Sequence, residues 1–245
     1  MYMAIEHAQM RATLQARVGQ GERERRDLRD VRERLLQVLE HGQIAIALQP
    51  IVRLADGVVV GHEALARFPL EYDLSTGRWF EDAARTGLSV ELELAAAAAA
   101  LARFASLPPE TFLSVNVSPE TACSDRLRQL IAGHDLRRLV LEVTEHTPVD
   151  DYGRLNQRLS ALQEEGVRIA VDDTGAGFAS LRHVLRLAPD IIKLDITLVR
   201  EVDQRPRMQT LIAALLTFAQ GTGADLIAEG VENAAQRDFL QHSGC

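Results

Sequence analysis

The sequence predicts an α/β fold, a TIM-type (βα)8-like barrel with one antiparallel strand, preceded by an N-terminal helix. Short apolar runs rich in Val, Ile and Leu end in polar residues, and helical stretches lie between most of these runs. Such runs are typical of strands buried on both faces and of parallel βα units. The first two runs are joined only by "LADG", which is too short for a crossover. We therefore expect them to form an antiparallel hairpin.

The N-terminal residues 1–34 are predicted to form a separate charged helix or linker, ahead of a domain that covers residues 35–245. The stretch "GERERRDLRDVRERLLQVLE" is dense in charge and in good helix formers. Its apolar residues follow a three-four-three spacing like a short coiled-coil seam: Leu28, Val31, Leu35 and Val38. Two interpretations stay open, an exposed amphipathic helix and a dimerising or signalling helix that follows another domain.

Seven apolar runs follow, and we expect each of them to be a strand. In chain order they are "IAIALQP", "VVVGHEALAR", "FLSVNVS", "LVLEVTE", "RIAVDD", "DIIKLD" and "DLIAEGVE". Helices are expected at 88–105, 151–165, 177–187 and 204–221. A closed barrel of this type has eight strands. Because the chain stops at "QHSGC", where an eighth strand would begin, we expect the final strand to be missing from it.

Composition narrows the class of protein. The chain has 245 residues, is 47% hydrophobic and carries a formal net charge of -8, which argues against a nucleic-acid duplex as partner. Its two cysteines, Cys123 and Cys245, do not form a disulfide framework and are typical of a reducing compartment. No signal peptide and no apolar run of membrane-spanning length is visible, so we expect a cytoplasmic protein without a membrane segment.

Polar side chains come at or near the ends of the predicted strands. They are Glu63, Asn116, Glu142, Asp172, Asp173, Lys193, Asp195, Glu229 and Glu232. A barrel gathers the carboxyl ends of its strands into one mouth, and so many carboxylates cannot stay ionised together there without cations. Oxygen ligands suit Mg²⁺ or Mn²⁺, and no His/Cys cluster of the zinc type is present. The adjacent Asp172 and Asp173 can serve two ions, the usual device for phosphodiester hydrolysis.

Simpler structural roles stay open for each of these residues. Asn116 can be a buried amide, and Glu142 and Glu145 can lie at a helix N-terminus, where acids are favoured. Asp172 or Asp173 can cap the following helix. Lys193 can pair with Asp195 in a structural ion pair.

The motifs together resemble the EAL-domain family, the phosphodiesterases that hydrolyse cyclic di-GMP to linear pGpG. The tripeptide Glu63-Ala64-Leu65 stands in "GHEALAR", and the other family signatures occur in order: "LQPIV", "SVNVS", "LEVTE", "DDTGAG", "IIKLD" and "AEGVE". The resemblance extends from about residue 32 to the end of the chain. It implies two Mg²⁺ or Mn²⁺ ions, cyclic di-GMP as substrate, a homodimer and an upstream sensor domain.

The resemblance also implies roles for individual residues. Ligands of the first metal would be Glu63, Asn116, Glu142 and Asp172. Asp172 would bridge to a second metal, with Asp173 and Glu229 nearby, and Lys193 would hold the attacking water, so that Glu63, Lys193 and Glu229 form the catalytic set. Gln49 and Arg67 would contact the substrate, and Glu145 would brace the loop after "DD", which couples dimerisation to metal binding. The role of Glu232, and whether Glu229 acts as general base or as ligand, are left open.

Two departures from the family pattern are visible. Thr174 and Ala176 stand where Phe and Thr are more usual, and we expect this change to be tolerated because both acids and both glycines of the loop are retained. A family strand beginning "QGY" is not in this chain, and only this departure argues for weak or absent turnover. The alternative is therefore a receptor or signalling module that binds cyclic di-GMP and cleaves it weakly or not at all. No "GGDEF"-like stretch is present, which excludes a cyclase.

Overall fold

The computed structural model describes residues 21–22, 24–144, 151–174 and 184–245, apart from the side chains of Asp173 and Thr174. Contacts within the chain divide it into two units, which we describe one at a time. The smaller unit comprises residues 1–44 and 68–92, and the larger unit comprises residues 45–67 and 93–245.

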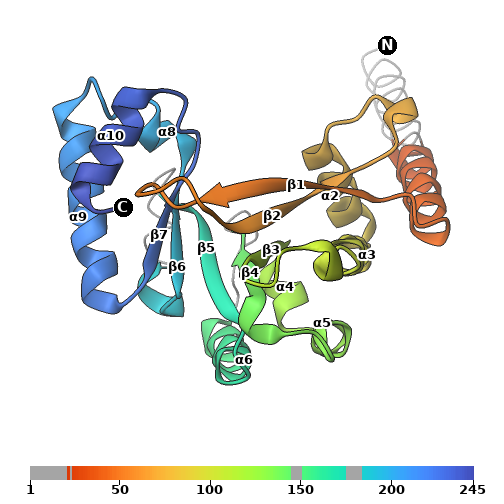
Figure 1. Cartoon of the computed structure of the whole chain (residues 1–245). Helices are drawn as coiled ribbons and strands as arrows, with labels where there is room; N and C mark the ends of the chain where they lie inside the picture. The colour runs from red at the N-terminus through yellow and green to blue at the C-terminus, as the bar shows by residue number, and fades with distance from the viewer. Residues whose placement is uncertain (1–20, 23, 145–150, 175–183) are drawn as a thin grey trace, which may run out of the picture. The chain divides into compact units, whose positions relative to one another are not determined.

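The larger unit is built on one curled seven-stranded sheet (Figure 1). Its strands are β1 (Ala45–Val52), β2 (Val59–Arg67), β3 (Phe112–Val117), β4 (Leu139–Val143), β5 (Arg168–Thr174), β6 (Ile191–Leu194) and β7 (Asp225–Ala228). They lie in chain order across the sheet, β1 antiparallel to β2 and every later neighbour parallel. The predicted α/β barrel-like fold with one antiparallel strand is therefore confirmed.

The sheet does not close within the described residues. There β1 pairs with β2 alone and β7 pairs with β6 alone, so each has one edge without a strand partner. The hairpin between β1 and β2 turns through Gly57, whose φ of 73° is readily adopted by glycine, and Asp56 Oδ1 accepts a hydrogen bond from the Val58 amide.

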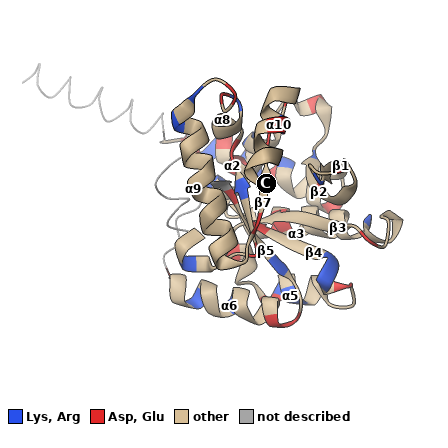
Figure 2. Ribbon diagram, turned by 60° about the vertical axis from the view of Figure 1, so that its left-hand side comes forward, with Lys and Arg blue, Asp and Glu red and all other residues tan. Residues whose placement is uncertain are grey.

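Helices follow the strands as predicted, with some differences in extent. They are α3 (Ser89–Leu101), α4 (Pro119–Ala122), α5 (Asp125–Ile131), α6 (Tyr152–Glu164), α8 (Ile196–Val199), α9 (Pro206–Thr222) and α10 (Ala234–Ser243), with 3-10 turns η2 (Phe104–Ser106) and η3 (Leu136–Arg138). The helix expected at 88–105 thus ends earlier, and most of the one expected at 177–187 lies outside the described residues. No helix in the described part of the chain is both long and apolar enough to cross a membrane. Charged residues lie mainly on helices and loops, whereas the strands are mostly uncharged (Figure 2).

A layer of apolar side chains packs together below the polar end of the sheet. Phe112, Val140, Ala170 and Ile191 are all buried and form one cluster. Gly61 makes room for this layer, because a Cβ atom there would lie 2.4 Å from the Phe112 ring. The acidic residues Glu63, Glu142 and Asp172 lie on the carboxyl-terminal side of this apolar layer.

The smaller unit holds the N-terminal helical stretch against α2 (Thr76–Thr86). Residues 24–40 are helical, and Val31, Leu35 and Val38 of the predicted seam are buried in the single chain. The buried carboxylate of Asp82 forms ion pairs with the guanidinium groups of three arginines, and the shortest distance, 2.6 Å, is to Arg34. Most of the seam is therefore already packed and not free for a partner helix. The helix continues past residue 34, and the domain boundary proposed there stays a prediction.

Candidate active site

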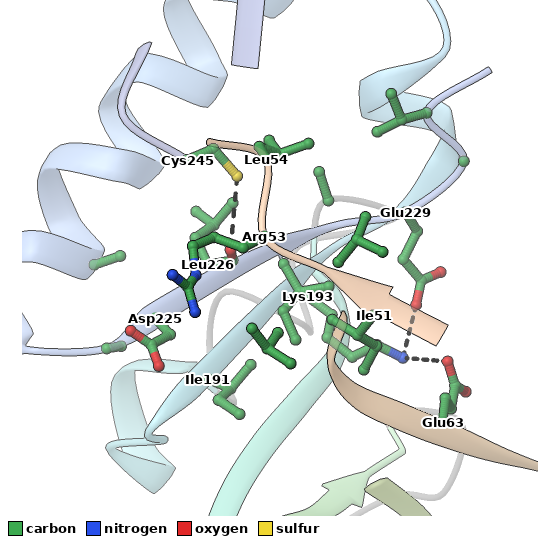
Figure 3. Close-up of a pocket in the computed structure, with 18 of the residues that line it drawn as sticks. Ile51, Arg53, Leu54, Glu63, Ile191, Lys193, Asp225, Leu226, Glu229 and Cys245 are labelled. Atoms are coloured by element: carbon green, nitrogen blue, oxygen red, sulfur yellow. Dashed lines mark hydrogen bonds and ion pairs between the residues drawn. The ribbon is translucent and has the colours of Figure 1, made fainter. Parts of the chain in front are cut away.

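Four carboxylates meet at one ammonium group at the polar end of the sheet, and Figure 3 shows two of them, Glu63 and Glu229, with Lys193. The Nζ atom of Lys193 lies 2.6 Å from Glu229, 2.8 Å from Glu142, 3.1 Å from Asp172 and 3.4 Å from Glu63. These residues come from β2, β4, β5 and β6 and from the position just after β7. Residues far apart in sequence are therefore brought together by the strand order alone.

Glu229 is held at the end of β7 by its backbone. Its amide donates to the Leu194 carbonyl, which continues the β6–β7 ladder by one bond. The next residue, Gly230, has a φ of 66°, and a Cβ atom there would lie 2.2 Å from the Ile196 side chain. A residue without a side chain is needed at this turn, which aims the Glu229 carboxylate toward Lys193.

Neighbouring strands orient two of the carboxylates. Asn116 on β3 donates from Nδ2 to Glu63 Oε1 at 3.2 Å, and Ser114 on the same strand donates from Oγ to Glu142 Oε1 at 2.6 Å. Ser114 and Glu142 are both fully buried. Sequence reasoning missed Ser114. The available signal was its position two residues before Asn116, because alternate strand residues share a face.

The cluster contains four carboxyl groups but only one ammonium group. Burial raises the pKa of Glu142 to about 7; the Lys193 ammonium opposes this rise, and the Glu63 and Asp172 carboxylates add to it. Burial likewise raises the pKa of Glu229. Burial acts to lower the pKa of Lys193, but the surrounding carboxylates outweigh it and raise that pKa above its usual range. Lys193 is thus a fixed positive charge among acids that repel one another.

The donor set fits a divalent cation. One ammonium has three N–H donors and cannot satisfy four carboxylates, and the buried Asp172 Oδ1 has only its ion pair with Lys193 at 3.1 Å and no hydrogen bond in the described structure. Carboxylate and amide oxygens are the ligands that Mg²⁺ and Mn²⁺ prefer. Among the described residues no group of three or more His, Cys, Asp or Glu side chains is already arranged to hold a metal ion, and the four carboxylates converge on the Lys193 ammonium instead. A cation would therefore have to share these oxygens with Lys193.

A cavity of about 1180 Å³ adjoins the cluster and lies between β1 and β7 (Figure 3). Gln49, Glu63, Asp172, Lys193 and Glu229 line its polar end. Gln49 is exposed and lies directly across the β1–β2 ladder from Glu63. Arg67 is also exposed, at the end of β2, but it does not line this cavity.

The remaining predicted residues lie elsewhere or outside the described structure. Asp195 caps α8 by accepting from the Thr197 amide at 2.8 Å, and the ion pairs that Lys193 makes in the described structure do not include it. Glu232 is exposed beside the α10 cap, 3.9 Å from Arg200. The Asp173 side chain, Glu145 and residues 175–183 lie outside the described residues.

Comparisons with known proteins identify the family to which this fold belongs. The model of the EAL domain family matches residues 32–245. The probable cyclic di-GMP phosphodiesterase PdeG of Escherichia coli is 32% identical over 86% of this chain and 44% of its own length. A solved complex of the PaMucR phosphodiesterase with cyclic di-GMP is 28% identical, with a TM-score of 0.76 over 88% of this chain and 92% of that one.

A second solved structure contains both a metal and the nucleotide. The Klebsiella pneumoniae BlrP1 complex with manganese and cyclic di-GMP is 28% identical, with a TM-score of 0.69, and covers 82% of this chain. This chain spans 53% of that protein and 44% of PdeG, so both relatives are considerably longer. The family match over nearly the whole chain, together with the fold, shows that the chain belongs to the EAL domain family.

Proposed function

We propose that this chain is a metal-dependent phosphodiesterase that hydrolyses cyclic di-GMP to linear pGpG in bacterial second-messenger signalling. The observation that carries the proposal is the convergence of four carboxylates on Lys193 beside a cavity large enough for a nucleotide. The family relatives that bind or cleave cyclic di-GMP support the choice of substrate.

Two divalent cations, Mg²⁺ or Mn²⁺, would be held by the cluster. Glu63, Asn116, Glu142 and Asp172 would bind the first, and Asp172, Asp173 and Glu229 the second. Bound there, the cations would polarise a phosphoryl oxygen and acidify water. The nucleotide is anionic and so is the cluster, so the cations would offset the repulsion between them. The manganese-containing BlrP1 complex supports this choice of metal.

The protein's own side chains would orient the attacking water and accept its proton. Lys193 keeps its positive charge and can donate to the attacking water and to the phosphate as negative charge develops. Glu229 is 31% exposed, has a raised pKa and faces the cavity, so its carboxylate is suited to accept the proton of that water. Glu63 would orient the same water while Asn116 holds its other oxygen.

Further parts of the proposal concern binding and context. Gln49 would contact the nucleotide at the polar end of the cavity, and Arg67 would bind a phosphate from the end of β2. Glu145 would brace the loop after Asp173. We further propose a cytoplasmic homodimer under the control of an upstream sensor domain.

Turnover with a matched pair of variants tests the proposal. The chain is incubated with cyclic di-GMP and Mg²⁺ or Mn²⁺, and pGpG is separated by chromatography. Glu63→Ala should abolish pGpG release while the circular dichroism spectrum stays unchanged. The control Glu164→Ala removes an exposed acid at the end of α6 and should leave release intact. Nucleotide binding without product at any metal concentration would replace the proposal with the receptor function.

A further inference from the structure

Lys193 is the only lysine of the chain, and the other 26 of its 27 basic Lys and Arg residues are arginines. Arginine occupies every other such basic position, and the one lysine lies at the centre of the acidic cluster. This difference indicates that the site requires a property that arginine lacks.

The geometry shows which property that is. A guanidinium is a planar fork that matches one carboxylate at a time, whereas an ammonium is compact and donates in three directions. Around Asp82, in the smaller unit, three arginines share one carboxylate. Around Lys193 the arrangement is reversed, and four carboxylates from separate strands approach one nitrogen within 2.6–3.4 Å.

We propose that the Lys193 ammonium occupies the position among the four carboxylates that a divalent cation would take, and that it competes with the cation for their oxygens. The inference rests on the proposed function only in taking a divalent cation as cofactor. The carboxylate side chains of the cluster are 1–31% exposed, so they need a positive charge among them, which either the ammonium or a cation can supply.

The competition follows from the contacts. Each carboxylate that turns to a cation weakens its contact with Nζ, and the ammonium repels the incoming positive charge. Asp172 Oδ1 is buried, has no hydrogen bond in the described structure and lies 3.1 Å from Nζ, so it is one of the oxygens for which the two positive charges would compete. The remaining contacts of Lys193 would then loosen as the cation binds.

Neutralising Lys193 should therefore tighten cation binding even though it removes a proposed catalytic group. In Lys193→Met, which keeps the length of the side chain, the loss of repulsion between two close charges should lower the Kd for Mn²⁺ by roughly tenfold or more. Mn²⁺ binding is measured by calorimetry and by the loss of the free-ion electron paramagnetic resonance signal, without substrate.

Arg168→Met is the matched control. Arg168 also lines the cavity, but it lies at the opposite end of the strands, over the Phe112 ring and 3.8 Å from Asp225. Its removal takes away the same charge without touching the cluster, and the Kd for Mn²⁺ should stay within about twofold because the distant charge is screened.

A measurement on the unmodified chain keeps the proposal testable if Lys193→Met does not fold. Lysine labelled with ¹⁵N at Nζ gives a single side-chain resonance, because lysine occurs once. Addition of Mg²⁺ should shift this resonance, and the midpoint of the shift should lie at the Kd that calorimetry gives for Mg²⁺.

The outcomes separate the inference from the proposed function. A resonance that does not move at saturating Mg²⁺, or a Kd in Lys193→Met that is equal or weaker, would overturn the competition while leaving phosphodiesterase activity possible. No binding of Mn²⁺ or Mg²⁺ by the unmodified chain would overturn both.

Discussion

Removing the hydroxyl of Ser114 tests how the core of the cluster is held together. Its Oγ lies 2.6 Å from Glu142 Oε1, and both side chains are fully buried. A hydrogen bond to a charged group is worth about 1.5–3 kcal/mol, and Ser114→Ala would leave a buried carboxylate oxygen without its donor. We expect the free energy of unfolding to fall by about 2 kcal/mol, which corresponds to about 4–8 °C in Tm for a chain of this size.

The assay is urea denaturation at pH 8 with a chelator present, so that no cation binds the cluster. Ser114→Thr keeps the hydroxyl and should recover most of the loss. Thr111→Val is the control, since Thr111 is equally buried and donates to the Pro108 carbonyl at 2.9 Å, an uncharged acceptor. It should cost only about 1 kcal/mol. A loss for Ser114→Ala no larger than that of the control would refute the reasoning.

Two further predictions concern pH and backbone. The raised pKa of Glu142 means that the folded state binds this proton more tightly than the unfolded state does. Its contribution to stability is therefore full below about pH 4.5 and is lost as the pH rises through about 7, an effect of about 3 kcal/mol in the metal-free protein. Urea titrations from pH 5 to 8 should show this slope, and Glu142→Gln should remove it; equal slopes would contradict the prediction. Gly230→Ala should cost about 3 kcal/mol and weaken Mn²⁺ binding, because a Cβ atom would meet Ile196 and φ is positive. Gly57→Ala, also at positive φ but with open space around it, should cost about 1 kcal/mol and leave binding unchanged, and equal costs would count against the steric argument.

Most of the fold could be predicted from the pattern of apolar strands in the sequence. Runs of branched apolar residues ended in acids, and the parallel order of the strands was enough to bring Glu63, Glu142, Asp172 and Glu229 together. The short "LADG" connector identified the one antiparallel pair. These features depend on local sequence and on simple topology, which is why they could be predicted.

Other features depend on three-dimensional contacts that the sequence does not display. The alternation in "FLSVNVS" places Ser114 on the same face as Asn116, but only the structure shows that its partner is Glu142 on β4. The sequence left open whether the helical seam is a dimerising helix, and only the burial of Leu35 and Val38 shows that it is packed within one chain. An ion pair between Lys193 and Asp195 was a further open alternative, but Asp195 instead caps α8.

The single lysine gives the chain an unusual response to proteolysis. A lysine-specific endoprotease has one peptide bond to cut, between Lys193 and Leu194, and both residues are buried in β6 with a strand on either side. Cleavage would separate residues 1–193 from 194–245 and requires that β6 leave the sheet. The appearance of these two fragments therefore reports, without any label, how often the innermost part of the acidic cluster opens.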